Sequence, residues 1–159
     1  MKVLSMTLPW ALVVPLQAKL WETRSWNTSY RGPLLVHAAK AWPRADQDMV
    51  FDHDADEYFP FWDVLVRQHG YTLSAMHAMR GHIIGMCTLV DTQRTEAVRD
   101  HLSEYERAFG NYGNKRFAWS VPHGRLLPTP IPARGALGLW TFDHPALDAL
   151  ATVDDASMA

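Results

Sequence analysis

The sequence predicts one domain of mixed α and β structure, an α+β fold in which short strands form a small twisted barrel with helices inserted between them. Three observations support this prediction. The chain has 159 residues, the usual size of a single domain. Strand-like and helix-like segments alternate along it without an internal repeat. Closing a sheet of short strands hides edges that would otherwise pair with other chains.

Apolar runs of strand length, bounded by glycine, proline and polar turn residues, indicate the strands. In chain order the predicted strands are residues 2–8, 19–26, 34–39, 81–89, 117–121, 124–128 and 138–142. The segment 81–89 has the longest apolar run of these and is expected to be buried. The proline-rich segment 126–135 is expected to be a connection, because proline cannot donate to a strand ladder.

Helical spacing of apolar side chains, together with proline at helix starts and glycine after helix ends, predicts the helices. They are a short helix from Pro9 and helices over residues 59–69, 73–79 and 95–109. The segment 46–57 has no strong periodicity and is expected to be a loop or a loosely packed helical turn. We expect the domain to span residues 1–145, with 146–159 as a disordered tail.

The charges are unevenly distributed, although the net charge is only −2. Residues 1–45 carry six Lys or Arg and one carboxylate, whereas residues 46–63 carry seven carboxylates and no Lys or Arg. A protein that coats long nucleic acid needs many phosphate contacts and is usually basic overall. This balance argues against long, non-specific nucleic acid as a partner. A short single strand, a nucleotide or a small anion still suits a local basic face.

Composition excludes several other classes. No apolar run reaches the ~20 residues of a membrane span, and prolines and polar residues interrupt the N-terminal segment, so no cleaved signal is expected. The single cysteine, Cys87, rules out an internal disulfide and favours a reducing compartment such as the cytoplasm. The histidines have no zinc spacing with cysteine, and no Gly-rich phosphate loop is present. We expect no metal and no cofactor.

The segment KLWETRSW, residues 19–26, concentrates charged groups on one predicted strand. Lys19 supplies a mobile point charge, while Arg24 and the later Arg31 supply planar donors suited to phosphate or a base edge. Glu22 can accept from an exocyclic amine. Glu22 and Arg24 would share one face of the strand and Lys19 would lie on the other, so a purely structural ion pair of Glu22 and Arg24 is the alternative interpretation.

Two aromatic residues and one histidine complete the predicted ligand-binding set. Trp26 or Trp119 would stack on an unpaired base. Burial in the core is the alternative for either indole. His37 is the single polar side chain of an apolar strand, where it is either a buried structural imidazole or a group that faces a ligand.

The segment LSMTLPWALVVPLQAKLWETRSWNTSYRGPLLVHAA resembles the opening of ASCH domains, which belong to the PUA-like superfamily. Their hallmark is Gly-x-Lys-x-x-Glu-x-Arg after a Pro-Trp or Pro-Tyr helix. Lys19, Glu22 and Arg24 match it, and Gln17 replaces the glycine. The similarity continues through YRGPLLVHAA, GHIIGMCTLVD and FAWSVPHGRLLPTPIPARGALGLWTF. It implies a PUA-like twisted β-barrel with flanking helices and a cleft lined by the hallmark residues.

The resemblance implies binding of short single-stranded RNA, or of a nucleotide or modified nucleoside, in that cleft. Hydrolysis is the alternative, with Lys19 and Glu22 as catalytic residues of a ribonuclease and His37 as a second candidate base. Some ASCH proteins are amidohydrolases of acetylated cytidine nucleosides that use a Thr three residues after the Lys. Glu22 occupies that position here, which argues against this activity. A protein-interaction module using the acidic segment 46–57 is the third possibility.

Overall fold

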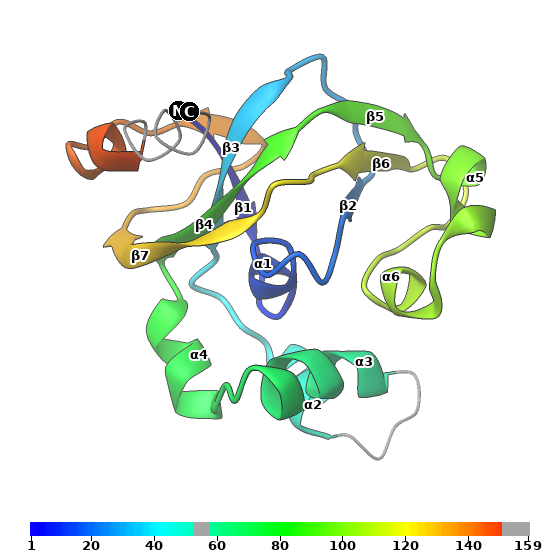
Figure 1. The fold of residues 1–159 in the computed structure, drawn as a ribbon, viewed down its shortest axis with the longest axis horizontal. Helices are drawn as coiled ribbons and strands as arrows, with labels where there is room; N and C mark the ends of the chain where they lie inside the picture. Colours follow the sequence, from blue (N-terminus) through cyan, green and yellow to red (C-terminus); the bar gives the residue numbers. More distant parts are fainter. Residues whose placement is uncertain (53–57, 151–159) are drawn as a thin grey trace.

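The computed structural model describes residues 1–52 and 58–150, which form two sheets with a group of helices below them and further helices at their ends (Figure 1). The strands are β1 Lys2–Met6, β2 Trp21–Arg24, β3 Gly32–Ala38, β4 His82–Leu89, β5 Asp91–Arg94, β6 Phe117–Ser120, β7 Arg125–Pro132 and β8 Leu139–Thr141. The five-stranded sheet has the order β7-β4-β3-β1-β8, and the three-stranded sheet has the order β2-β6-β5. The α+β prediction is confirmed. The described strands form two sheets rather than one closed barrel.

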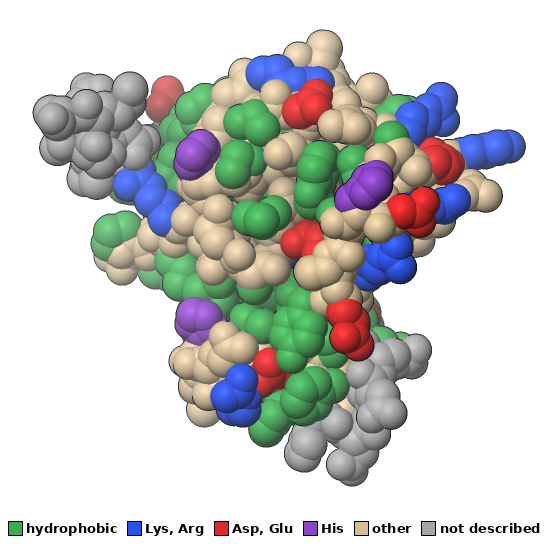
Figure 2. All heavy atoms as spheres, turned by 45° about the vertical axis from the view of Figure 1, so that its right-hand side comes forward, with side chains coloured by type: hydrophobic (Ala, Val, Ile, Leu, Met, Phe, Trp, Pro, Cys, Tyr) green, Lys and Arg blue, Asp and Glu red, His purple; other side chains and the backbone are tan. Residues whose placement is uncertain are grey.

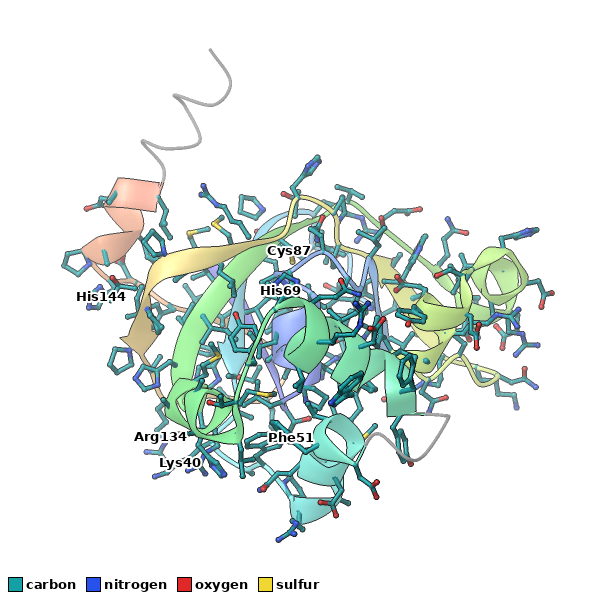
Figure 3. The ribbon with its side chains drawn as sticks, turned by 60° about the horizontal axis from the view of Figure 1, so that its bottom comes forward. Lys40, Phe51, His69, Cys87, Arg134 and His144 are labelled. Carbon is teal, nitrogen blue, oxygen red and sulfur yellow. The ribbon has the colours of Figure 1, made fainter. Side chains whose placement is uncertain are left out.

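The helices are short and lie mostly in one group. They are α1 Trp10–Val13, α2 Arg44–Phe51, α3 Phe59–Trp62, the π-helix Asp63–Gln68, α4 Leu73–Met79, α5 Thr95–Val98, the 3₁₀-helix Arg99–His101 and α6 Glu104–Ala108. Figure 1 shows α1 between the strands and the group α2–α4, with α5 and α6 at the far end of β5 and β6. Figure 3, viewed from the helical side, shows this group in front of the sheets. Within the described residues, no helix has the length and apolar character to cross a bilayer.

Two apolar clusters hold the five-stranded sheet from its two faces. In β1, Leu4 packs with α1 on one face, and Val3 packs into the smaller cluster on the other. This alternation follows from the two-residue period of a strand. The strand β1 is parallel to β3 and antiparallel to β8.

The Cys87 thiol of β4 is buried, and burial raises its pKa to about 12, so it is unreactive at neutral pH.

The predicted helix 95–109 is broken into three pieces. Leu102 is extended (φ −89°, ψ 152°), and the Ser103 hydroxyl caps the next helix by accepting from the N–H of Glu106 at 3.1 Å. A capping serine inside a helical pattern favours this new start. The predicted helix 59–69 begins as α3 and continues as a π-helix.

The acidic segment takes the helical one of its two predicted alternatives in the part that the structure describes. Residues Arg44–Phe51 form the helix α2, which is longer than a single turn and buries Val50 in the core. The remaining residues 53–57 lie outside the described residues.

The strand predicted over 124–128 is observed as β7, but it continues to Pro132 through most of the proline-rich segment 126–135, which was expected to be a connection. This strand is the edge of the five-stranded sheet and pairs with β4, with Ile131 opposite Ile83. An edge strand has one side without ladder bonds, so it accommodates prolines that an inner strand excludes. The register with β4 shifts between Ile83 and Gly85, which corresponds to a bulge at the prolines.

The ordered chain extends beyond residue 145. Residues 146–150 are helical, and Leu147 and Leu150 are buried in the smaller apolar cluster. The rest of the expected tail, residues 151–159, lies outside the described residues.

The face that carries α5 and α6 shows Lys, Arg, Asp and Glu interspersed rather than one continuous basic surface (Figure 2).

The turn before β2 predicts a stability effect at Gln17. This residue has φ 59°, a left-handed conformation that costs a side chain about 1–2 kcal/mol. Replacing Gln17 by Gly removes that strain, partly offset by the greater freedom of glycine in the unfolded chain. We expect Gln17→Gly to raise the free energy of unfolding by about 0.5–1 kcal/mol in urea titrations.

The matched control is the adjacent Ala18, which is outside the left-handed region. Ala18→Gly should lower the free energy of unfolding by up to about 1 kcal/mol. A Gln17→Gly protein less stable than wild type would contradict the strain argument. It would mean that the hydrogen bond from Gln17 Nε2 to the Val14 carbonyl, at 3.1 Å, outweighs the strain.

Candidate functional site

The turn between α1 and β2 decides where Lys19 points. The N–H of Lys19 donates to the Val13 carbonyl at 2.9 Å, just after the left-handed Gln17. The strand begins only at Trp21, so Lys19 does not follow the alternation of a strand that starts at residue 19. Its side chain instead turns back to the carboxylate of Glu22. Sequence reasoning placed Lys19 and Glu22 on opposite faces; the later strand start brings them together.

The carboxylate of Glu22 joins the hallmark cations. Its Oε1 accepts from Lys19 Nζ at 2.7 Å and from the N–H of Thr23 at 3.0 Å. Its Oε2 accepts from Arg24 Nη2 at 3.3 Å. The same Arg24 nitrogen donates to the Ser5 carbonyl at 3.1 Å. We refer to Lys19, Glu22 and Arg24 as the charged triad.

Burial and charge act in opposite directions on the triad. Lys19 is 1% exposed and Glu22 is 4% exposed, whereas the Arg24 side chain is 26% exposed. Burial raises the pKa of Glu22. The positive charges of Lys19 and Arg24 and the hydrogen bonds to the carboxylate lower it by more, so the pKa lies below its ordinary value. Two cations and one ionised carboxylate therefore give the triad a net positive charge at neutral pH.

The triad lines one side of an open pocket of about 690 Å³, which we call the triad pocket. This volume lies within the range of ligand sites for small molecules. The pocket is formed by the end of β1, by β2, by the segment 110–116 and by the loop 136–138. Its lining includes Ser5, Trp10, Lys19, Glu22, Thr23, Arg24, Trp26, Asn111, Arg116 and Leu137. The triad is therefore buried but borders a solvent-reachable space.

The two candidate stacking residues have different positions. Trp26 is partly exposed and lines the triad pocket. Trp119 is fully buried and lies against Trp26 edge-to-face, with ring centroids 4.8 Å apart and an angle of 88°. Trp119 has no face open to a ligand in this structure. It supports Trp26 from behind, a geometry that aromatic pairs favour.

The other two candidates lie outside the triad pocket. Arg31 donates to the carbonyls of Thr28 and Tyr30, at 2.9 and 2.8 Å, and to Thr92 Oγ1 at 3.0 Å, so it fastens the loop before β3 to β5. His37 is buried and lines the neighbouring pocket instead. The structure thus brings together Lys19, Glu22, Arg24 and Trp26 of the predicted set.

Sequence reasoning missed the wall formed by residues 110–116. Asn111 donates its N–H to Thr23 Oγ1 at 3.0 Å, and Arg116 Nε donates to the Asn111 carbonyl at 3.1 Å. Both residues line the triad pocket. The only available signal was the turn composition of Asn111-Tyr112-Gly113-Asn114, which predicts a loop but not its contact with β2.

Glu106 of α6 fixes the backbone next to Lys19. Its carboxylate accepts from the N–H of Leu20, at 3.0 Å to Oε2, and from the N–H of Trp21, at 3.0 Å to Oε1. Tyr112 donates its hydroxyl to Oε1 at 3.4 Å. Burial raises the pKa of Glu106 more than these hydrogen bonds and Lys19 lower it. Glu106 therefore anchors the start of β2 to α6.

The fold can be compared with solved structures. The crystal structure of the ASCH protein from Zymomonas mobilis matches with a TM-score of 0.53 and 12% identity, covering 95% of this chain and 93% of that chain. Two single-residue variants of that protein each match with a TM-score of 0.51 and 12% identity. They cover 95% and 96% of this chain, and 96% and 94% of their own. This chain has the ASCH fold. No family model and no curated protein sequence matches it.

The ASCH fold explains the one departure from the hallmark. The position that the hallmark gives to glycine is Gln17, and its backbone is left-handed. Glycine adopts that conformation without steric cost. A glycine at this position would therefore suit the turn. Gln17 adopts the same left-handed backbone at a steric cost, and Lys19, Glu22 and Arg24 stay at the positions that the hallmark gives them.

The first prediction for the triad concerns its carboxylate. Glu22→Gln leaves the buried ammonium of Lys19 without a countercharge, and breaking a buried pair in this way typically costs about 3 kcal/mol or more. We expect a loss of that size in the free energy of unfolding. The double variant Lys19→Met, Glu22→Gln removes both charges and should lose less than Glu22→Gln alone. Additive losses in this double-mutant cycle would show that the pair is not coupled.

The second prediction concerns pH. The folded pKa of Glu22 is below its ordinary value of 4.5, so its contribution to stability is present above about pH 4.5 and is lost as the pH falls towards the folded pKa. The difference in unfolding free energy between wild type and Glu22→Gln should therefore shrink below about pH 4.5. Urea titrations between pH 7 and pH 3 measure it. A difference that stays constant over this range would contradict the assigned ionisation.

Proposed function

We propose that this chain is a PUA-like ASCH domain protein that binds short single-stranded RNA, or a nucleotide-like or modified-nucleoside ligand, in the triad pocket. One observation carries the proposal: a positively charged triad and a partly exposed indole, Trp26, line the same pocket. The charge suits phosphate or an electron-rich base edge, and the indole suits the face of a base. The single buried Cys87 agrees with a cytoplasmic setting.

The donors around the pocket support a ligand with several acceptors. Arg24 is partly exposed and fixed by two hydrogen bonds, so its guanidinium is already oriented. Arg116 also lines the pocket and is held by the Asn111 carbonyl. Preorganised guanidinium groups lose little conformational freedom on binding. The pocket is therefore suited to a polyfunctional anion.

The contacts of Glu22 favour binding over hydrolysis. A general base needs a pKa near the working pH, and each hydrogen bond that it accepts from a cation makes it less basic. Glu22 already accepts from Lys19, Thr23 and Arg24, and its pKa is lowered. The ammonium of Lys19 is likewise directed at Glu22. The ribonuclease and amidohydrolase alternatives are therefore weaker. The protein-interaction alternative depends on the acidic segment, whose residues 53–57 lie outside the described part of the chain.

The test of binding uses Trp26. Short RNA tetramers should change the indole fluorescence of the wild type, and Trp26→Ala should weaken affinity by roughly 5- to 150-fold, the range expected for one lost stacking contact. Trp62→Ala is the control, because this indole belongs to α3 and lines neither the triad pocket nor its neighbour. Thermal unfolding checks that both variants are folded. Equal affinities for wild type and Trp26→Ala would overturn the proposed site.

A separate measurement tests hydrolysis. RNA tetramers and N4-acetylcytidine incubated with the protein should be recovered unchanged by chromatography. New product peaks that disappear in Lys19→Ala would replace the binding proposal with a hydrolase. Peaks that persist in Lys19→Ala would indicate a contaminating enzyme.

A further inference from the structure

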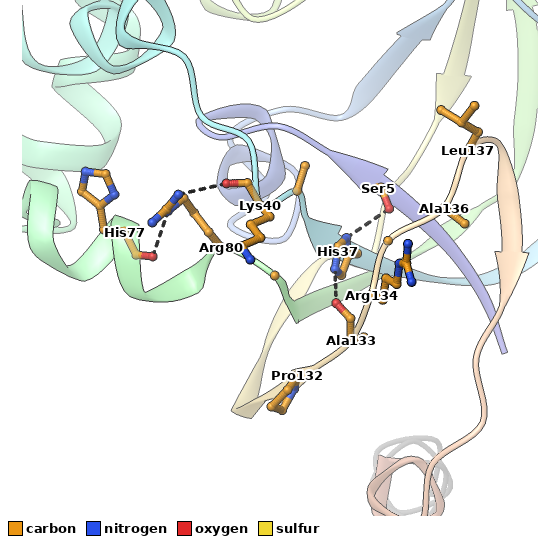
Figure 4. Close-up of a pocket in the computed structure, with 13 residues that line it drawn as sticks. Ser5, His37, Lys40, His77, Arg80, Pro132, Ala133, Arg134, Ala136 and Leu137 are labelled. Atoms are coloured by element: carbon orange, nitrogen blue, oxygen red, sulfur yellow. Dashed lines mark hydrogen bonds between the residues drawn. The ribbon is translucent and has the colours of Figure 1, made fainter.

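A second, larger pocket lies beside the triad pocket and carries only positive charge. Its volume is about 1010 Å³, and it is formed by the end of β3, the turn from α4 into β4 and the loop after β7 (Figure 4). Its three formal cations are Lys40, Arg80 and Arg134, and no Asp or Glu of the described residues 1–52 and 58–150 lines it. We call it the cationic pocket.

The three cations are not paired with any carboxylate in the part of the chain that the structure describes. Among the described residues, none of Lys40, Arg80 and Arg134 forms an ion pair. Arg80 donates to backbone carbonyls, from Nη1 to Lys40 at 3.0 Å and from Nε to His77 at 3.3 Å. These bonds orient its guanidinium without neutralising it. Figure 4 shows Lys40 and Arg80 on one side of His37 and Arg134 on the other.

His37 holds the loop that carries Arg134. A carbonyl only accepts, so the 2.8 Å contact with Ala133 places the proton on His37 Nε2. Nδ1 then accepts from the Ser5 hydroxyl at 3.0 Å in the neutral ring. Gly135 lies so close that a Cβ there would be 2.8 Å from His37 Cε1. The loop is therefore seated on His37, which makes His37 a positioning residue for Arg134.

The two pockets share a wall. Ser5, Ala39, Ala136 and Leu137 line both of them. Leu137 is 99% exposed, so it presents an apolar side chain at the boundary. The two pockets are therefore neighbours, separated only by these four residues.

From this arrangement we propose that the cationic pocket binds the phosphate groups of the ligand whose base occupies the triad pocket. The ligand class is then a short phosphodiester-linked strand rather than a free nucleoside. Three cations that line one pocket suit phosphate, since guanidinium and ammonium groups bind it by charge-assisted hydrogen bonds. The inference rests on the proposed function, which supplies the base in the triad pocket.

The test compares ligands with and without phosphate. Adenosine, cytidine and uridine, and the tetramers A4, C4 and U4, are titrated into wild type and into Lys40→Ala, Arg134→Ala by indole fluorescence. Arg80 is left intact because its bonds to the backbone also support the fold. We expect the tetramers to bind wild type more tightly than the nucleosides do. The double variant should lose roughly tenfold in tetramer affinity and none for nucleosides.

Salt dependence and a matched control sharpen the result. Removing two phosphate contacts should make the slope of log affinity against log salt shallower by about 1.4 for a single strand. Arg44→Ala, Arg94→Ala removes the same charge from exposed positions that line neither pocket, and should leave both affinity and slope nearly unchanged. This control separates a local site from a change in overall charge.

The outcomes distinguish the two proposals. Tetramer affinity lost in Lys40→Ala, Arg134→Ala but retained in the control supports the phosphate site. The phosphate site is overturned if nucleosides and tetramers bind equally well, or if the variant and the control lose equal tetramer affinity. In either case, nucleoside binding that depends on Trp26 leaves the proposed function standing. Tetramer binding that is insensitive to Trp26→Ala overturns the proposed function instead. Absence of binding by every compound overturns both.

Discussion

The carboxylate of Glu22 is the contact on which the candidate site depends. It is buried, ionised and bonded at once to Lys19, to Arg24 and to the backbone of Thr23. A buried ion pair is weak evidence for net stability, because desolvation cancels much of the attraction. The clear effect of the Glu22 carboxylate is to fix the positions of the Lys19 and Arg24 side chains. Without the carboxylate, two cations would repel each other beside a pocket, and Arg24, at the end of β2, would keep only its bond to the Ser5 carbonyl of β1 among the two that orient it.

A second layer of contacts keeps this arrangement rigid. Glu106 holds the backbone at Leu20 and Trp21, and the buried indole of Trp119 supports Trp26. Each of these supports comes from an element distant in sequence: α6 supplies the carboxylate and β6 supplies the indole. The site is therefore assembled by tertiary packing around a short hallmark segment, and the hallmark alone does not fix its geometry.

Sequence reasoning found the charged residues and most of the elements because these depend on local signals. Helix α4 was predicted with the observed bounds, 73–79, and the apolar strand 81–89 matches β4 to one residue. The errors arose where non-local contacts decide. Lys19 was placed on the wrong face because the strand start depends on a left-handed turn. The strand predicted over 124–128 was ended too early, before Pro132, because its tolerance for proline depends on its place at a sheet edge.

The charged triad forms one side of the triad pocket, and loops form its other sides. This arrangement bears on the selectivity of the pocket. Lys19, Glu22 and Arg24 are the residues that the ASCH hallmark specifies, and they supply charge without a shape particular to one base. The walls come from residues 110–116 and from the loop after β7. That loop is seated by His37 and also carries Arg134. The same loop borders both pockets, so a change in its conformation alters both of them together. In the proposed complex, selection among bases would act through these loops, and the triad would provide the attraction common to all of them.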